Sequence, residues 1–290
     1  MAALNLWNPS LGLSIPMVIV TAYLLGMLHG ITPDEHTWPI TFSYAIGAYS
    51  TRGGLVAGLT FSLAFTVQRG IASELAYLAL ARWLQNPVVD AWVYVIVGLA
   101  MALAGLYMRR TGRVVHLHGT QAHLHHEEEP RSIPPSMALV HGFLAGWGFG
   151  AFALIIYTVL APSMHHAALG WVPGVAFGLG TMTIQATAGA LFGRWMHRMK
   201  LPERLARQVA RSTAATTLFY GGWAFVVAGI ATLLFPRITE WSIVTPLHIH
   251  NLHSLGIGFA LVTFTVIVVG LGSLIRSMRA VRHLMEDGIT

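Results

Sequence analysis

Residues 14–36 of the chain, SIPMVIVTAYLLGMLHGITPDEH, decide its class of fold. A bilayer core is crossed by about 20 apolar residues in a helix, and residues 14–28 contain no charged side chain. The stretch then ends in His29, Asp34, Glu35 and His36. Ionisable side chains inside a membrane are costly and usually functional. The stretch therefore predicts a first membrane span that carries a candidate ion site.

The composition excludes a soluble enzyme. Of the 290 residues, 55% are hydrophobic and 10% are charged, whereas an average soluble domain has about 25% charged residues. The net charge of +6 does not indicate nucleic-acid binding, because the basic residues stand at the ends of apolar segments. The absence of cysteine excludes disulfides, iron–sulfur clusters and thiolate metal sites within these residues. The expected partner is the lipid bilayer.

The pattern of apolar segments predicts an all-α membrane protein with about seven transmembrane helices. Basic residues gather after the third and fifth segments and in the C-terminal tail, which predicts that these parts are cytoplasmic. We therefore expect a protein of the cytoplasmic (inner) membrane with its N-terminus outside and its C-terminus inside. The predicted spans are 14–36, 54–81, 91–108, 136–160, 171–195, 213–235 and 254–275.

Matching motifs in the two halves predict an inverted repeat of three helices plus three. The matches are His29-Gly30 with His141-Gly142, Gln68 with Gln185, and Gly98-x-Ala100-x-x-x-Ala104-Gly105 with Gly222-x-Ala224-x-x-x-Ala228-Gly229. Such repeats are typical of secondary transporters, although small residues also recur by chance on packing faces. The predicted units are a first repeat (1–112), a His/Glu-rich cytoplasmic loop (113–135), a second repeat (136–240), and a seventh helix with a basic tail (241–290).

The His/Asp cluster needs a broken helix in order to converge. On a regular helix His29 and His36 share a face, but Asp34 lies about 140° away from His29. Pro33 removes a backbone hydrogen bond and predicts a break at that point. Imidazole and carboxylate without thiolate suit Ni²⁺, Co²⁺, Zn²⁺, Mn²⁺ or Fe²⁺. We predict His29, Asp34, Glu35 and His36 as metal ligands, unless the helix end simply meets water.

Further polar residues extend this hypothesis. His141, followed by a glycine-rich run, is a second predicted metal ligand or a structural histidine. Gln68, Arg69, Glu74 and Gln185 are predicted to line a pathway, to couple proton or cation movement, or to bond helix to helix. Histidines outside the spans are predicted to collect metal, or to belong to a solvated linker; they are His116, His118, His123, His125 and His126 in the middle loop and His248, His250 and His253 before the last span.

The first-span motif, together with the three-plus-three plan and the His-rich loop, resembles the nickel/cobalt permease and efflux family of the lysine-exporter superfamily. The resemblance implies that His29, Asp34 and His36 select and bind the metal. Glu35 stands between the acid and the second histidine, where the family pattern has no residue.

These observations predict a secondary transporter of Ni/Co-like divalent cations that works by alternating access, without a prosthetic group and without enzymatic activity. One alternative is a small-anion or amino-acid exporter of the same superfamily, in which Arg69 faces the substrate. A second alternative is an intramembrane metalloenzyme. The sequence leaves the metal, the direction of transport and a homo-oligomeric state open.

Overall fold

The computed structural model describes residues 6, 9, 12–32, 34–80, 86–111, 135–148, 150–199, 201–246 and 254–286, and these are almost entirely helical. In chain order the elements are α1 (Ile15–Ile31), α2 (Trp38–Gly47), α3 (Thr51–Leu75), η1 (Ala76–Leu80), α5 (Pro87–Thr111), α6 (Pro135–Ala145), α7 (Ala151–Ile155), η2 (Ile156–Leu160), η3 (Ala167–Leu169), α8 (Val172–Arg198), α9 (Glu203–Leu234), η4 (Pro236–Glu240), β1 (Ile243–Val244), β2 (Ser254–Leu255), α10 (Ile257–Val262), η5 (Thr263–Leu271) and α11 (Gly272–Glu286). The strands β1 and β2 pair antiparallel, with Ile243 opposite Leu255.

The prediction of an all-α membrane protein is confirmed. Large apolar side chains such as Leu63, Leu103 and Val227 are 54–65% exposed on the outer helix faces, which only lipid solvates well. The predicted orientation of the termini stays a prediction. Five helices are long and apolar enough to cross a membrane, namely Thr51–Leu78, Pro87–Arg110, Ala167–Arg198, Arg204–Leu234 and Ile257–Arg282, and two apolar helices are shorter, Ile15–Ile31 and Ser136–Ala145.

The first and fourth predicted spans are interrupted, which corrects their expected extent of 14–36 and 136–160. Helix α1 ends at Ile31, and Thr32 is extended (ψ 141°) because a residue that precedes proline avoids the helical region. Helix α6 ends at Ala145, and the helix resumes at α7 only after the extended Gly150 (φ −128°, ψ 166°). Proline and a glycine-rich run therefore interrupt corresponding helices of the two halves.

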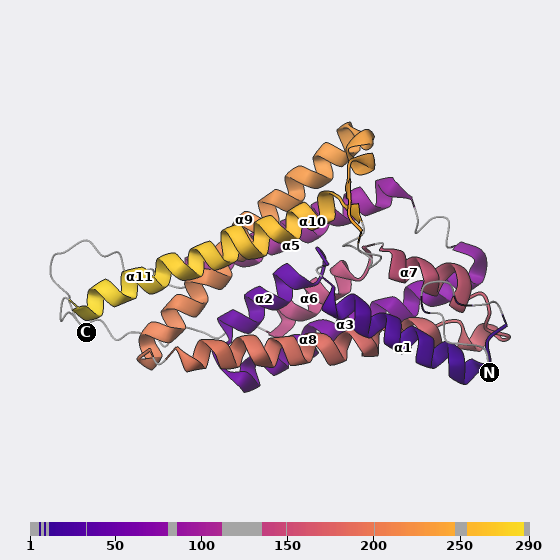
Figure 1. The fold of residues 1–290 in the computed structure, drawn as a ribbon, viewed down its shortest axis with the longest axis horizontal. Coiled ribbons are helices and arrows are strands. Elements are labelled where there is room, and N and C mark those ends of the chain that lie inside the picture. The colour runs from indigo at the N-terminus through magenta and orange to yellow at the C-terminus, as the bar shows by residue number, and fades with distance from the viewer. Residues whose placement is uncertain are drawn as a thin grey trace.

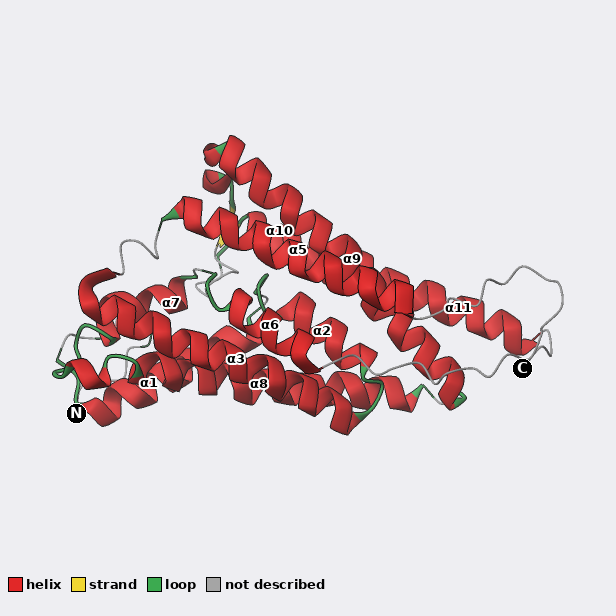
Figure 2. Ribbon diagram, turned by 180° about the vertical axis from the view of Figure 1, so that it is seen from behind, coloured by secondary structure: helices red, strands yellow, loops and turns green. Residues whose placement is uncertain are grey.

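The helices form two slabs that run the length of the molecule. In both views, α5, α9 and the run from α10 to α11 lie along one side, while α1, α3 and α8 lie along the other (Figure 1 and Figure 2). Helices α2 and α6 lie between these groups (Figure 1). Helix α2 contacts α9 of the first slab and α8 of the second, so it joins the two.

The packing exchanges the two halves of the chain. Helix α3 packs on α8 and α5 packs on α9, so that the second helices of the halves meet each other and the third helices meet each other. The first helices cross over, because α1 packs on α8 and α6 packs on α3. This is the contact pattern that a pseudo-two-fold axis produces. The boundaries of the predicted repeat units stay a prediction.

Glycines permit the close approach of α5 and α9. A Cβ atom added to Gly98 would lie 2.6 Å from the carbonyl oxygen of Gly222 and 2.8 Å from Cβ of Phe225. Small residues let membrane helices come close enough for van der Waals packing to hold them together. The matching glycine motifs of the two halves thus form one interface.

We expect Gly98→Ala to lower the free energy of unfolding by about 1–3 kcal/mol, because the new methyl group overpacks this interface. The measurement is denaturant unfolding of the purified protein in detergent. Gly272→Ala is the matched control, since its added Cβ meets no heavy atom within 4 Å. Equal stability of the two variants would contradict the packing described here.

Candidate functional site

The break between α1 and α2 holds the predicted cluster. His29 lies in the last turn of α1, and its carbonyl accepts a hydrogen bond from the Thr32 hydroxyl at 3.2 Å. His36 follows the break, two residues before α2 begins at Trp38. His29, Asp34 and His36 are each 4% exposed. The sequence therefore breaks the helix where the polar side chains must converge, as the position of Pro33 predicted.

The four residues form a row of short contacts, two between side chains and one from a backbone N–H. His29 Nδ1 lies 3.7 Å from Asp34 Oδ2. The backbone N–H of His36 donates to Asp34 Oδ1 at 3.0 Å, which fixes the carboxylate between the two histidines. His36 Nδ1 lies 3.6 Å from Glu35 Oε1. Two imidazoles and two carboxylates thus share one buried space inside an apolar bundle.

Tyr94 of α5 extends the row, and sequence reasoning missed it. Its hydroxyl donates to Glu35 Oε1 at 2.9 Å. Its ring stacks parallel on the His36 ring, with centroids 5.1 Å apart. Asp90 lies one helical turn earlier, in the first turn of α5. The one available signal was the polar pair Asp90 and Tyr94, four residues apart at the start of an apolar span. That pattern does not indicate which helix the pair faces.

The break in the other half lies against the same row. A Cβ atom on Gly148 would lie 2.5 Å from the ring of His36, so only a glycine permits this approach. Gly146 packs directly on the side-chain amide of Gln68. His36 Nε2 and the Gln68 amide have no hydrogen-bond partner among the described residues. The two interrupted helices therefore meet at His36.

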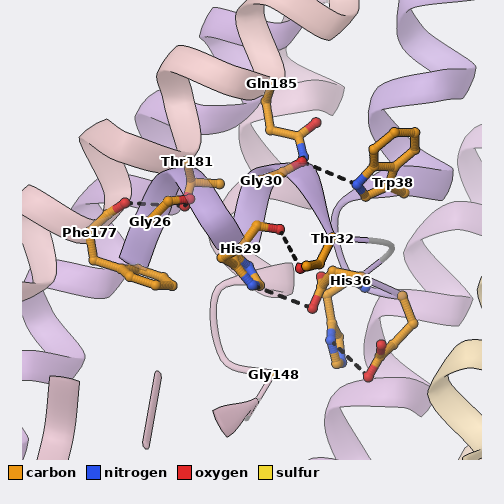
Figure 3. A network of polar contacts seen from close by, with 12 residues as sticks. Gly26, His29, Gly30, Thr32, His36, Trp38, Gly148, Phe177, Thr181 and Gln185 are labelled. Carbon is orange, nitrogen blue, oxygen red and sulfur yellow. Dashed lines mark hydrogen bonds and ion pairs between the residues drawn. The ribbon is translucent and has the colours of Figure 1, made fainter. Parts of the chain in front are cut away.

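Carbonyls that the break in α1 leaves free are bonded by side chains from elsewhere. Figure 3 shows Trp38 and Gln185 on the carbonyl of Gly30, with donor distances of 3.2 and 3.4 Å. Farther inside α1, the Thr181 hydroxyl adds a bond to the carbonyl of Gly26 at 3.1 Å. The last carbonyls of any helix lack partners within it. Gln185, a predicted pathway residue, thus serves helix-to-helix bonding at the site's edge.

Arg69 supports the break of the other half rather than pairing with a carboxylate at bonding distance. Its guanidinium donates to the Gly148 carbonyl at 3.2 Å and to the Tyr157 hydroxyl at 2.8 Å. The same group lies 4.6 Å from the ring centroid of Phe65 and 5.5 Å from that of Phe177. Aromatic faces stabilise a buried cation in this way. None of these contacts supports the hypothesis that Arg69 faces a substrate.

Other predicted residues lie apart from the row. His141 Nδ1 lies 3.0 Å from the Tyr44 hydroxyl and 2.7 Å from the Met137 carbonyl. Glu74 lies near the end of α3, where a Cβ atom on Gly170 would come within 2.7 Å of its Oε2. The remaining predicted histidines lie outside the described residues; they are His116, His118, His123, His125, His126, His248, His250 and His253.

Asp34, Glu35 and His36 form the one group of three potential metal-ligand side chains found among the described residues. One ligand atom from each lies within 4.8 Å of the others. His29 and His141 do not belong to that group. The roles of all five residues as metal ligands stay predictions.

The fold and the site define a polytopic membrane protein in which two interrupted helices meet around buried titratable side chains. The chain belongs to the family described as "Cytochrome C biogenesis protein transmembrane region", whose model matches residues 69–223, more than half of the chain. Comparisons with curated proteins and with solved structures give no match.

The family match corrects two predictions. Membership of the nickel/cobalt permease and efflux family is wrong, and so is the predicted transport of Ni/Co-like cations. The exporter alternative rested on the same superfamily and falls with it. The resemblance depended on three residues at a helix break, and imidazole and carboxylate side chains serve protons, water and metals alike. The matched region begins at Arg69, beyond that motif.

We expect Arg69→Lys to loosen the second break, because an ammonium group cannot reach both the Gly148 carbonyl and Tyr157 in the guanidinium's geometry. Loss of a buried hydrogen bond to a charged group costs about 1.5–3 kcal/mol. Hydrogen exchange in peptides that cover residues 144–152 should rise. Arg276→Lys on exposed α11 is the control and should leave exchange unchanged. Unchanged protection in Arg69→Lys would contradict the anchoring role.

Proposed function

We propose that this protein serves cytochrome c biogenesis in the membrane by moving protons through the row His29, Asp34, His36, Glu35 and Tyr94. The observation that carries the proposal is the row itself, which lies where two interrupted helices meet. Its side-chain contacts are 3.7 Å for His29 with Asp34, 3.6 Å for His36 with Glu35 and 2.9 Å for Tyr94 with Glu35, and ligand atoms of Asp34, Glu35 and His36 lie within 4.8 Å of one another. Chains of Asp, Glu and His inside membrane proteins mark proton relays. Family membership supports the biological setting.

The lack of cysteine favours protons over electrons as the species that this chain moves. Haem of c-type cytochromes is attached at Cys-x-x-Cys-His, so cytochrome c biogenesis depends on cysteine chemistry. These 290 residues contain no cysteine and hold no thiol or disulfide relay of their own. Thiol chemistry therefore lies outside these residues, and the titratable row is the chemistry that they offer.

We place the two ends of the path at Asp90 and His29. Asp90 is half-buried in the first turn of α5, one helical turn before Tyr94, and we propose it as the entry to the row. At the other end His29 lies deep among the rings of Phe65, Phe152 and Phe177. Imidazole and carboxylate groups both accept and release protons. A proton that enters at Asp90 would therefore move inward from group to group.

The paired breaks support a gate. Half-helices that end at the centre of a repeat protein let one half rock against the other around a fixed site. His36 and Gly148 are the point at which the breaks touch, and no side chain separates them. Movement of the Gly148 segment away from His36 would expose one side of the row to water. We propose this contact as the gate of the proton path.

We expect Asp34→Asn to reduce proton flux about 100-fold, the lower end of what a positioned proton-transfer group contributes. The amide keeps the shape of the side chain and its acceptor for the His36 N–H, but it no longer takes up a proton. The measurement is the response of a pH-sensitive dye inside liposomes that contain the purified protein, after a potassium diffusion potential is imposed. The matched control is Glu240→Gln, which changes an exposed acid in η4.

Treatment with the chelator EDTA distinguishes this proposal from a metal-dependent process. We expect wild-type flux to be the same with and without EDTA, and His165→Gln, at an exposed histidine, to behave as wild type. Absence of proton flux in the wild type would overturn the proposal. A flux that requires an added divalent cation would overturn it as well.

In cells from which the gene for this protein is deleted, we expect the wild-type gene to restore c-type cytochromes. The Asp34→Asn gene, expressed at an equal protein level, should not restore them. The physical reason is that the variant retains the fold but not the proton-carrying group. The measurement is haem staining of c-type cytochromes in membrane extracts. Full restoration by Asp34→Asn would show that the row is not needed for biogenesis.

A further inference from the structure

An apolar groove of about 450 Å³ opens on the outer face of the bundle, between α2, α8 and η5. Its walls include Trp38 and Phe42 from α2, Leu191 and Trp195 from α8, and Leu271 from η5. The inner wall rests on a core in which Phe42 is 1% exposed, whereas Leu191 and Trp195 are 60% and 42% exposed. The groove thus has a buried inner wall and an open side that faces the lipid.

The walls suit a hydrocarbon chain. Phe42 and Trp38 both meet the ring of Phe192 edge-on, at centroid distances of 5.4 and 6.3 Å, which holds the aromatic wall in place. Almost no polar surface lines the recess. Binding pockets of a few hundred cubic ångströms with such linings take apolar groups. The groove therefore accommodates an acyl chain but does not distinguish one lipid class from another.

Selectivity comes from the rim. Leu191, Arg194, Trp195 and Arg198 are spaced i, i+3, i+4 and i+7, so they share one face of α8. Arg194 and Arg198 are exposed and make no ion pair with another described residue. Beyond Leu271 the exposed face of α11 adds Arg276 and Arg279. Guanidinium groups bind phosphate bidentately, and basic pockets between membrane helices bind anionic head groups.

We infer that the groove binds one anionic phospholipid, with an acyl chain against Trp38, Leu191 and Trp195 and its phosphate at Arg194 and Arg198. A second copy of the chain fits less well, because a symmetric contact would bring the two arginine rims together. Trp38 links the groove to the candidate functional site. Trp38 lines the groove, and its indole N–H donates to the carbonyl of Gly30 at the break in α1. A bound acyl chain therefore holds one bond of the break in place.

The test is native mass spectrometry of the detergent-purified protein with phosphatidylglycerol or phosphatidylcholine of identical acyl chains. We expect the wild type to retain phosphatidylglycerol about tenfold better than phosphatidylcholine, because phosphatidylglycerol brings a net negative charge to the two arginines, whereas the choline ammonium of phosphatidylcholine balances its phosphate. The double variant Arg194→Gln/Arg198→Gln should lose this preference and keep the weak binding of both lipids. Trp195→Ala should weaken the binding of both.

Matched controls lie elsewhere on the surface. Arg237→Gln in η4 and Trp223→Ala on α9 change an exposed arginine and an exposed tryptophan outside the groove, and both should retain phosphatidylglycerol as the wild type does. Equal retention of the two lipids by the wild type would overturn the inference. So would a preference that survives the double arginine variant, which alters only exposed side chains. A dimer that Trp195→Ala dissociates, without a lipid preference, would assign the groove to a second copy.

Discussion

Two helices that stop inside an apolar bundle leave free carbonyl groups where lipid cannot bond them, and the rest of the structure meets that constraint. An unsatisfied backbone group costs several kcal/mol in hydrocarbon. The carbonyl of Gly30 is bonded by Gln185, and that of Gly148 by Arg69. Each donor lies on the second helix of the opposite half. The breaks therefore hold only while the two halves stay interlocked.

This crosswise support explains why the polar residues of α3 and α8 are buried in otherwise apolar helices. Gln185 on α8 reaches across to α1, and Arg69 with Gln68 on α3 reaches the segment after α6. The same exchange appears in the helix packing, where α1 contacts α8 and α6 contacts α3. Local structure and tertiary packing thus share one cause. A helix break requires a donor, and the nearest donors belong to the other half.

The sequence predicted the class of fold and the place of the first break, because both depend on local chemistry. Long apolar runs require lipid, and Pro33 imposes an extended residue before it. Tyr94 and Trp38 were missed because their contacts with Glu35 and Gly30 depend on how helices pack. The predicted function was wrong for another reason. A motif of three side chains indicates which ions those side chains could bind, but it does not identify the family. The family match rests on residues 69–223.

The charges around the row explain why the same residues fit proton movement. Asp34 and Glu35 bring two negative charges into the bundle, and the guanidinium of Arg69 close to the Gly148 break compensates one. Buried charge is tolerated when it is balanced, so protonation of these groups is a further way to balance the carboxylates. Two imidazoles and two carboxylates, paired at 3.7 Å (His29 with Asp34) and 3.6 Å (His36 with Glu35), are four groups that can hold a proton. A row with several places for a proton is suited to pass a proton along.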